Sequence, residues 1–281
     1  MRLPISEVTL QLMVFALALA TVAPQAQESA VDARRRNLDQ VLDLYVRDGY
    51  VYYRALRQER RLLDAYLNGV ATASINSASR DEQLAFWLNA YNALALRTVI
   101  DHAPIPQRSR EYPPGSIRQI PGAFERLTHR VAGRTVTLDQ IEQTILPAFK
   151  DPRVYFALGR GAVGSGRLRS EPFTAAGLER QLTEVANECV THAQCVAIDR
   201  AQNKVMVSSI FSWREKEFSA AYGDKAPPAF SSRSPIERAV LAFVGPRLLT
   251  TERDFLATNE FRVEYAPFDW SLNDLTGRGG Q

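Results

Sequence analysis

The chain has 281 residues, of which 46% are hydrophobic, 23% charged and 9% aromatic, with 15 Gly and 15 Pro. These values are average for a globular protein and exclude disordered, collagen-like and coiled-coil chains. The formal net charge is +3, and only four of the 34 cationic residues are Lys, so Arg dominates. Apart from Arg34–Arg36, charges of both signs alternate with no basic block interleaved with aromatic residues, which argues against nucleic-acid binding.

The N-terminus has the features of a secretory signal peptide. Arg2 precedes an apolar run from Leu10 to Val22, and small and polar residues follow. This run is too short to span a bilayer but suits the hydrophobic region of a signal peptide. We expect cleavage after Ala26, so that residues 1–26 are removed and the mature chain is secreted or periplasmic with no transmembrane segment. An uncleaved anchor is the alternative.

The next elements are helical. Apolar residues recur at helical spacing over residues 33–46 and 57–70, and a short Tyr-rich strand is expected at 51–53. A capping-box pattern over residues 79–82 starts a third helix. From Leu84 to Ile100 that helix is apolar on every face, which predicts a helix buried on all sides in the core.

Two asparagines interrupt this apolar helix. Asn89 and Asn92 are three residues apart, so they project from one side, and a buried carboxamide costs a few kcal/mol unless it is hydrogen-bonded. They either bind a neighbouring loop and fix its shape, or line a polar pocket together with Tyr91. We favour the first interpretation, since a loop fixed in this way can itself form a site.

The central part of the chain predicts a hairpin and a further helix. Residues 127–138 alternate around Ala132-Gly133, as in a hairpin with a tight turn. Thr137 and Gln140 then cap a helix that ends near Phe149. The apolar run 154–158 is typical of a buried strand.

The last third alternates helices and strands. We expect helices at 174–190 and 211–221 and from Pro235 onward, and strands at 204–209 and 261–267. Because the order is not a regular βαβ alternation, we predict an α+β fold, mostly helical, with one small and largely antiparallel sheet. The sheet would be built from the 127–138 hairpin and the strands 154–158, 204–209 and 261–267. A single domain over 27–281 around the buried central helix is the simplest organisation.

Residues 159–164 read G-x-G-x-x-G directly after the expected strand, which is formally a dinucleotide fingerprint. Such a site requires a helix to begin at once, whereas Gly166 and Pro172 interrupt the segment. We therefore do not favour nucleotide binding. Backbone N–H groups here can form an anion nest flanked by three arginines, namely Arg160, Arg167 and Arg169.

The two cysteines, Cys189 and Cys195, are six residues apart. In an oxidising compartment this spacing predicts a local disulfide, which contributes about 2 kcal/mol in a chain-entropy estimate. His192 lies between them, so a metal site is the alternative, but zinc takes three or four protein ligands and no others cluster here. We predict a disulfide, no metal and no cofactor. A redox role is disfavoured because the pair lacks Cys-x-x-Cys spacing.

Five stretches occur in an order that resembles the domain of unknown function 547 family: EQLAFWLNAYNAL, TLDQIEQTIL, DPRVYFAL with its loop, VSSIFSWREKEF and FDWSLND. The likeness covers about Asp39 to Asp274 and suggests a bacterial, exported member. The family has no settled activity. The resemblance assigns a structural role to five motif residues, namely Glu142, Trp213, Asp269, Trp270 and Asn273.

The departures from the family pattern matter for function. Tyr155 stands where the pattern has His, and Arg160 and Ser165 stand where it has Cys. A His beside a Cys would suit acyl transfer or peptide hydrolysis, since a thiolate nucleophile needs a nearby base. Tyr is a poor base near pH 7, and Arg is not a nucleophile. As bases for Ser165, the sequence offers three histidines that fit structural roles better: His102, His129 and His192.

These observations favour a catalytically degenerate family member. It would bind a small molecule, peptide or envelope component at the Asn89/Asn92 and Gly159–Arg169 region, where Arg160 suits a carboxylate or phosphate. The alternative is a hydrolase or acyltransferase that uses Ser165 in place of Cys. The candidate binding residues are Asn89, Tyr91, Asn92, Tyr155, Arg160, Ser165 and Arg169.

Overall fold

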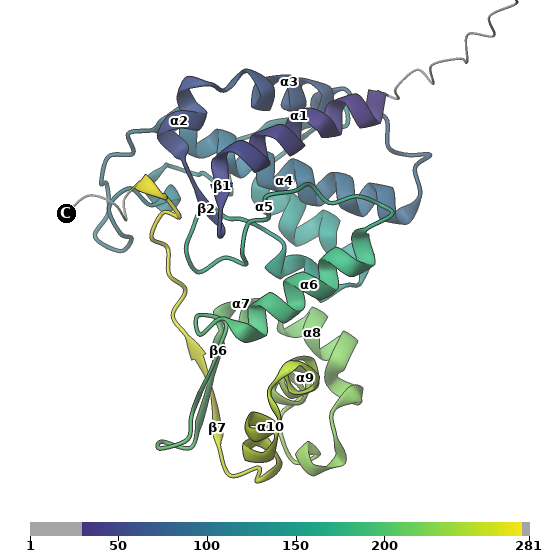
Figure 1. Ribbon diagram of the computed structural model, residues 1–281, viewed down its shortest axis with the longest axis vertical. Coiled ribbons are helices and arrows are strands. Elements are labelled where there is room, and N and C mark those ends of the chain that lie inside the picture. The colour runs from purple at the N-terminus through teal and green to yellow at the C-terminus, as the bar shows by residue number, and fades with distance from the viewer. Residues whose placement is uncertain (1–29, 277–281) are drawn as a thin grey trace, which may run out of the picture.

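The computed structural model describes residues 30–276 (Figure 1). The expected signal peptide, residues 1–26, lies outside the described residues. Within residues 30–276, no helix is long and apolar enough to cross a membrane.

The N-terminal part is a layer of helices. Figure 1 shows α1 and α3 side by side above the longer α4, and α1 contacts α3, which in turn contacts α4. Two short antiparallel strands follow α1, and Tyr53 already begins α2, so the strand expected at 51–53 is displaced. The elements are α1 (Ala30–Tyr45), β1 (Val46–Arg47), β2 (Tyr50–Val51), α2 (Tyr53–Gln58), α3 (Arg61–Ala71) and α4 (Arg80–His102).

Helix α4 is the buried central helix that the sequence predicts. Ser79 is its N-cap and accepts a hydrogen bond from the Glu82 backbone N–H, while the Glu82 side chain accepts one from the Ser79 N–H, so the capping box is confirmed. Every residue from Leu84 to Leu96 is buried. The helix therefore provides a rigid wall on which the following segments pack.

The predicted hairpin is confirmed as β3 (His129–Val131) and β4 (Arg134–Val136), which pair antiparallel. Its two turn residues, Ala132 and Gly133, both have positive φ angles of 50° and 74°, as a tight hairpin turn requires. Thr137 then caps a helical stretch that tightens toward its end. This stretch comprises α5 (Leu138–Gln140), the π-helical η2 (Ile141–Ile145) and the 3₁₀ turn η3 (Leu146–Phe149). A separate 3₁₀ turn, η1 (Ile117–Gln119), comes before the hairpin.

The prediction of a strand at 154–158 is wrong, because this segment forms the 3₁₀ helix η4 (Pro152–Phe156). Asp151 caps it by accepting a hydrogen bond from the Arg153 N–H at 3.1 Å, and Pro152 occupies the first turn, where a missing N–H costs nothing. A short apolar run buried on all sides has the same composition as a buried strand, so periodicity does not distinguish the two.

The C-terminal part combines a three-stranded sheet with small helices. In this sheet β5 pairs antiparallel with β6, and β6 pairs parallel with β7. Figure 1 places β6 and β7 beside α9 and α10 in the lower part of the molecule. The elements are α6 (Leu178–Thr191), β5 (Val196–Asp199), β6 (Lys204–Ser208), α7 (Ser209–Trp213), α8 (Glu215–Tyr222), η5 (Gly223–Lys225), η6 (Pro228–Phe230), α9 (Pro235–Val244), η7 (Gly245–Arg247), α10 (Thr250–Ala257) and β7 (Arg262–Ala266).

The α+β, mostly helical fold class is confirmed, whereas the single joined sheet is not. The described residues form three separate small sheets, and the β3–β4 hairpin does not join β6 and β7. One hydrophobic cluster nevertheless includes buried residues from Leu38 to Phe261. Four phenylalanine rings link η4 to α7, α8 and α9 at centroid separations of 4.7 to 5.8 Å, namely Phe156, Phe211, Phe218 and Phe243.

Candidate functional site

The two asparagines of α4 hold the ends of the Gly-rich segment. Asn92 Nδ2 donates to the Ala157 carbonyl at 3.0 Å, and its Oδ1 accepts from the Gly159 N–H at 2.8 Å. Asn89 makes the same pair of contacts with the backbone of Phe173, both at 2.8 Å. Each buried carboxamide thus satisfies a backbone donor and an acceptor, which is the loop-fixing arrangement that we favoured.

The glycines between these anchors allow close backbone approach. A Cβ on Gly166 would collide with the Phe156 carbonyl, and one on Gly164 would lie 2.7 Å from the Asp269 nitrogen. The N–H of Gly164 donates to the Asp269 carbonyl at 2.8 Å. Gly164 and Gly166 therefore let the loop pack against two other backbone segments, and the next helix, α6, begins only at Leu178, too late to receive a pyrophosphate.

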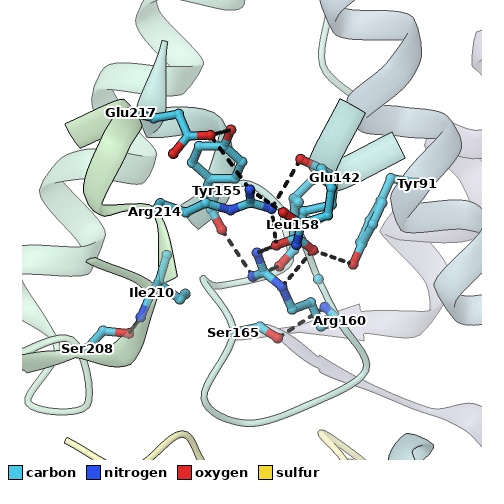
Figure 2. Close-up of polar contacts among 12 residues, drawn as sticks. Tyr91, Glu142, Tyr155, Leu158, Arg160, Ser165, Ser208, Ile210, Arg214 and Glu217 are labelled. Atoms are coloured by element: carbon cyan, nitrogen blue, oxygen red, sulfur yellow. Dashed lines mark hydrogen bonds and ion pairs between the residues drawn. The ribbon is translucent and has the colours of Figure 1, made fainter. Parts of the chain in front are cut away.

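A buried ion network lies beneath this loop. Figure 2 shows Arg160, Arg214 and Tyr91 directed at the carboxylate of Glu142, each from a different element. Arg160 makes a bidentate pair, with Nη2 2.7 Å from Oε1 and Nε 3.1 Å from Oε2. Arg214 Nη2 lies 3.0 Å from Oε1, and the Tyr91 hydroxyl donates to Oε2 at 3.1 Å. Glu142 lies in the π-helical η2, a geometry that is frequent at functional sites.

The network leaves no general base. Arg160, Arg214 and Glu142 are only 2%, 3% and 8% exposed. Burial raises the pKa of Glu142, but the guanidinium groups of Arg160 and Arg214 outweigh it and lower this pKa to about 2. Burial also raises the pKa of Tyr91 and of Tyr155, so both phenols stay protonated. An ionised carboxylate with such a low pKa is too weak a base for proton abstraction near pH 7.

Tyr155 and Arg160, two of the predicted binding residues, are part of this network. The Tyr155 ring lies under the Arg214 guanidinium, 4.2 Å from its carbon to the ring centroid, and the Tyr155 hydroxyl donates to Glu217 at 3.4 Å. Arg160 Nη1 donates to the Tyr155 carbonyl at 3.1 Å. At these two positions the side chains therefore make structural contacts within the network.

Ser165 lines a small pocket beside the loop. Its Oγ accepts a hydrogen bond from the Arg160 backbone N–H at 3.0 Å (Figure 2). The pocket has a volume of ≈ 110 Å³, and its lining includes Ser165, Asp48, Arg167, Glu188, His192 and both cysteines. Of the three histidines in the chain, His192 is the one at this pocket. Sequence reasoning missed Asp48 and Glu188, because their approach to the loop is set by the tertiary fold.

Residues 75–190 match the family model described as "Protein of unknown function, DUF547". This part of the chain is a DUF547 domain. It contains α4, Glu142, the Gly-rich loop and nearly all of α6, and so supplies Tyr91, Glu142 and Arg160 of the buried network and part of the pocket lining, whereas Arg214 lies outside it. No curated protein matches the chain, and no solved structure matches it.

The arginines of the DUF547 loop already have partners within the protein. Arg167 lies 2.7 Å from Asp48 and 3.8 Å from Glu188, while Arg169 lies 2.7 Å from both Glu171 and Glu184. Arg160 is paired with Glu142 as described above. Anion binding by these three guanidinium groups would require those ion pairs to open, and it stays a prediction.

The disulfide between Cys189 and Cys195 is confirmed, with the two Cα atoms 5.2 Å apart. It joins the last turn of α6 to the start of β5 and so fixes the His192 turn at the pocket rim. Within residues 30–276, no group of three or more His, Cys, Asp or Glu side chains is arranged to hold a metal ion.

The C-terminal segment that follows β7 packs across the DUF547 loop. Trp213, which is 45% exposed, forms an aromatic cluster with Phe268 and Trp270 at centroid distances of 4.4 to 6.2 Å. The side chain of Asn273 accepts a hydrogen bond from the Tyr53 hydroxyl at 2.7 Å and also lines the pocket. These motif residues therefore connect the C-terminal segment to the N-terminal layer beside the loop.

Proposed function

We propose that this protein is an exported, catalytically degenerate DUF547 protein that binds a ligand in the pocket beside Gly159–Arg169. One observation carries the proposal: the positions of the expected His and Cys belong to a buried, hydrogen-bonded ion network around Glu142. The N-terminal apolar run and the Cys189–Cys195 disulfide support export, since disulfides persist in oxidising compartments.

The charges of the pocket favour a neutral or cationic polar group. Asp48 and Glu188 supply two negative charges and Arg167 one positive charge, and Arg167 pairs with both acids. A further anion would therefore meet an excess of negative charge. At ≈ 110 Å³ the pocket accommodates one small group, such as the amino terminus of a peptide or the amine of an envelope component.

Calorimetric titration with trialanine and with N-acetyl-trialanine tests this proposal. We expect the free amine to bind at least tenfold more tightly than the acetylated peptide. Gln194 is exposed and lines the pocket, so Gln194→Trp should cover it and abolish binding. Gln202→Trp, at an exposed turn outside the pocket, should have no effect. A preference for the acetylated peptide, or binding that survives Gln194→Trp, contradicts the proposal.

The second candidate function is a hydrolase or acyltransferase that uses Ser165. It is favoured by a single observation, namely that Ser165 and His192 line the same pocket. The experiment is labelling of the mature protein with a serine-reactive phosphonate, with Ser165→Ala and His192→Ala as controls. The binding proposal expects no labelling, whereas labelling that both variants lose establishes Ser165 as an activated nucleophile.

A further inference from the structure

A second, larger pocket lies in the C-terminal helices, far along the chain from the DUF547 match. It has a volume of ≈ 390 Å³ and is lined by residues of η5, η6, α9, η7 and α10, of which Figure 1 shows α9 and α10 in the lower part of the molecule. Its lining is mainly apolar and includes Phe230, Leu241, Ala242, Pro246, Leu256 and Ala257. None of these residues belongs to the pocket beside the Gly-rich loop.

The sequence leaves this space open because small residues occur where the helices face each other. Ala242 and Gly245 are three residues apart and so lie on one side of the helix end, and Ala257 contributes from α10. A Cβ added to Gly245 would meet no atom within 4 Å. The pocket is therefore lined by small residues and has open space beside Gly245.

Two cations complete the lining, Lys225 and Arg253, and both side chains are exposed. Lys225 Nζ lies 4.9 Å from the Tyr222 ring centroid, and Arg253 Nη2 donates to Thr250 Oγ1 at 3.2 Å. Neither forms an ion pair with a carboxylate of residues 30–276, in contrast to the arginines of the Gly-rich loop.

The acidic neighbours of these cations, Asp224 and Asp254, are exposed and do not line the pocket. Leu249, just before α10, is 71% exposed, and its carbonyl accepts a hydrogen bond from the Arg253 N–H at 3.0 Å. The exposed Leu249 side chain thus lies one helical turn before Arg253, at the start of α10. The combination provides an apolar interior with positive charge at its edge.

We propose that this pocket binds a free fatty carboxylate of medium chain length. The alkyl chain lies along the apolar wall between α9 and α10, and the carboxylate pairs with Lys225 and Arg253. The volume falls within the range of about 300–1,000 Å³ that is usual for small-molecule pockets. This site is independent of the function proposed for the Gly-rich loop.

Isothermal titration calorimetry with octanoate, decanoate and dodecanoate, each below its critical micelle concentration, tests whether the pocket binds the alkyl chain. Each buried methylene should tighten binding about fourfold until the pocket is full. Dodecyltrimethylammonium has the same chain with the opposite charge and should bind at least tenfold more weakly than dodecanoate. Absence of dodecanoate binding, or equal affinity for the two amphiphiles, overturns the proposal.

Matched variants locate the site. Ala257→Trp should fill the pocket and weaken dodecanoate binding at least tenfold, while Ala220→Trp, at an exposed position of α8, should leave it unchanged. Ala229→Trp, which changes a lining residue in η6 instead of α10, gives an independent test if Ala257→Trp fails to fold. Binding that survives both pocket variants in folded protein contradicts the assignment.

A charge-reversal pair tests the polar end. Lys225→Glu combined with Arg253→Glu should weaken dodecanoate binding at least tenfold. Arg54→Glu combined with Lys216→Glu changes the net charge by the same amount at exposed positions away from the pocket and should have no effect. Equal losses in the two double variants would show a general charge effect and reject the carboxylate site.

Discussion

Two of the protein's arginine–carboxylate networks, one on the surface and one around Glu142, differ in their access to water. On the surface, Arg60, Asp64, Arg97 and Asp101 form a closed set of four ion pairs at 2.6 to 3.0 Å, with every side chain 32–35% exposed. In the interior, Glu142 is paired with two arginines at similar distances, yet these side chains are almost fully buried. The ion-pair distances are thus alike, and the two networks differ in their exposure to solvent.

This difference determines what each network contributes. Charges on side chains that are about one-third exposed are screened, and holding long side chains in one geometry costs entropy, so such pairs are worth about 0–1 kcal/mol. Buried charges have lost their hydration and depend on each other, so removal of one partner leaves an uncompensated charge in the interior. The buried network therefore fixes the position of the Gly-rich loop, whereas the surface network adds little to the stability of α3 and α4.

The largest expected effect comes from removing the buried acid. Glu142→Gln leaves the guanidinium groups of Arg160 and Arg214 without their shared counterion, and we expect the free energy of unfolding to fall by about 3–5 kcal/mol. Urea denaturation of the wild type and the variant measures this change.

A double-mutant cycle is the control for this prediction. Arg160→Met and Glu142→Gln should each destabilise strongly, but the double variant should be clearly more stable than the sum of the two losses predicts, because the two groups interact directly. Additive losses would show that Glu142 and Arg160 act independently and would remove the basis of the comparison.

The second prediction concerns the stability of the protein at low pH. The pKa of Glu142 is about 2 in the folded protein, below its ordinary value, because Arg160 and Arg214 outweigh the effect of burial. Its stabilising contribution is thus fully present above pH 4.5, and it declines as the pH falls toward 2. A shift of this size corresponds to about 3 kcal/mol. In the wild type, the free energy of unfolding should therefore decrease as the pH is lowered from 6 to 2.5. In Glu142→Gln this decrease should be smaller by the contribution of Glu142, and an unchanged pH dependence would contradict the low pKa of Glu142.

Local signals made much of the fold predictable. The Ser79 capping box, the all-round apolar α4 and the Ala132-Gly133 turn each depend on residues close together in sequence. The segment 154–158 was mispredicted because a Pro-initiated 3₁₀ helix and a buried strand share one apolar composition. The separation of the sheets was also hidden, since strand partners are chosen by tertiary contacts.

The candidate site was predictable only in part, for a related reason. The cost of burying two carboxamides pointed correctly to loop fixation by Asn89 and Asn92. The Glu142–Arg160 pair spans 18 residues and the Glu142–Arg214 pair spans 72, so no spacing rule connects them. An arginine in a Gly-rich loop suggested anion recognition, whereas the fold gives it a carboxylate of the protein.

The smallest expected effect comes from the surface network. Asp101→Asn removes the acid that contacts both Arg60 and Arg97, yet we expect a loss of at most about 1 kcal/mol, because water and Asp64 still solvate and pair the two guanidinium groups. The loss should shrink further when urea denaturation is repeated at 1 M salt, since screening acts on exposed pairs. A salt-independent loss of 3 kcal/mol or more would place this network with the buried one and show that partial exposure does not separate the two. Glu142→Gln, measured alongside, should keep its full loss at 1 M salt, because ions do not reach the buried carboxylate.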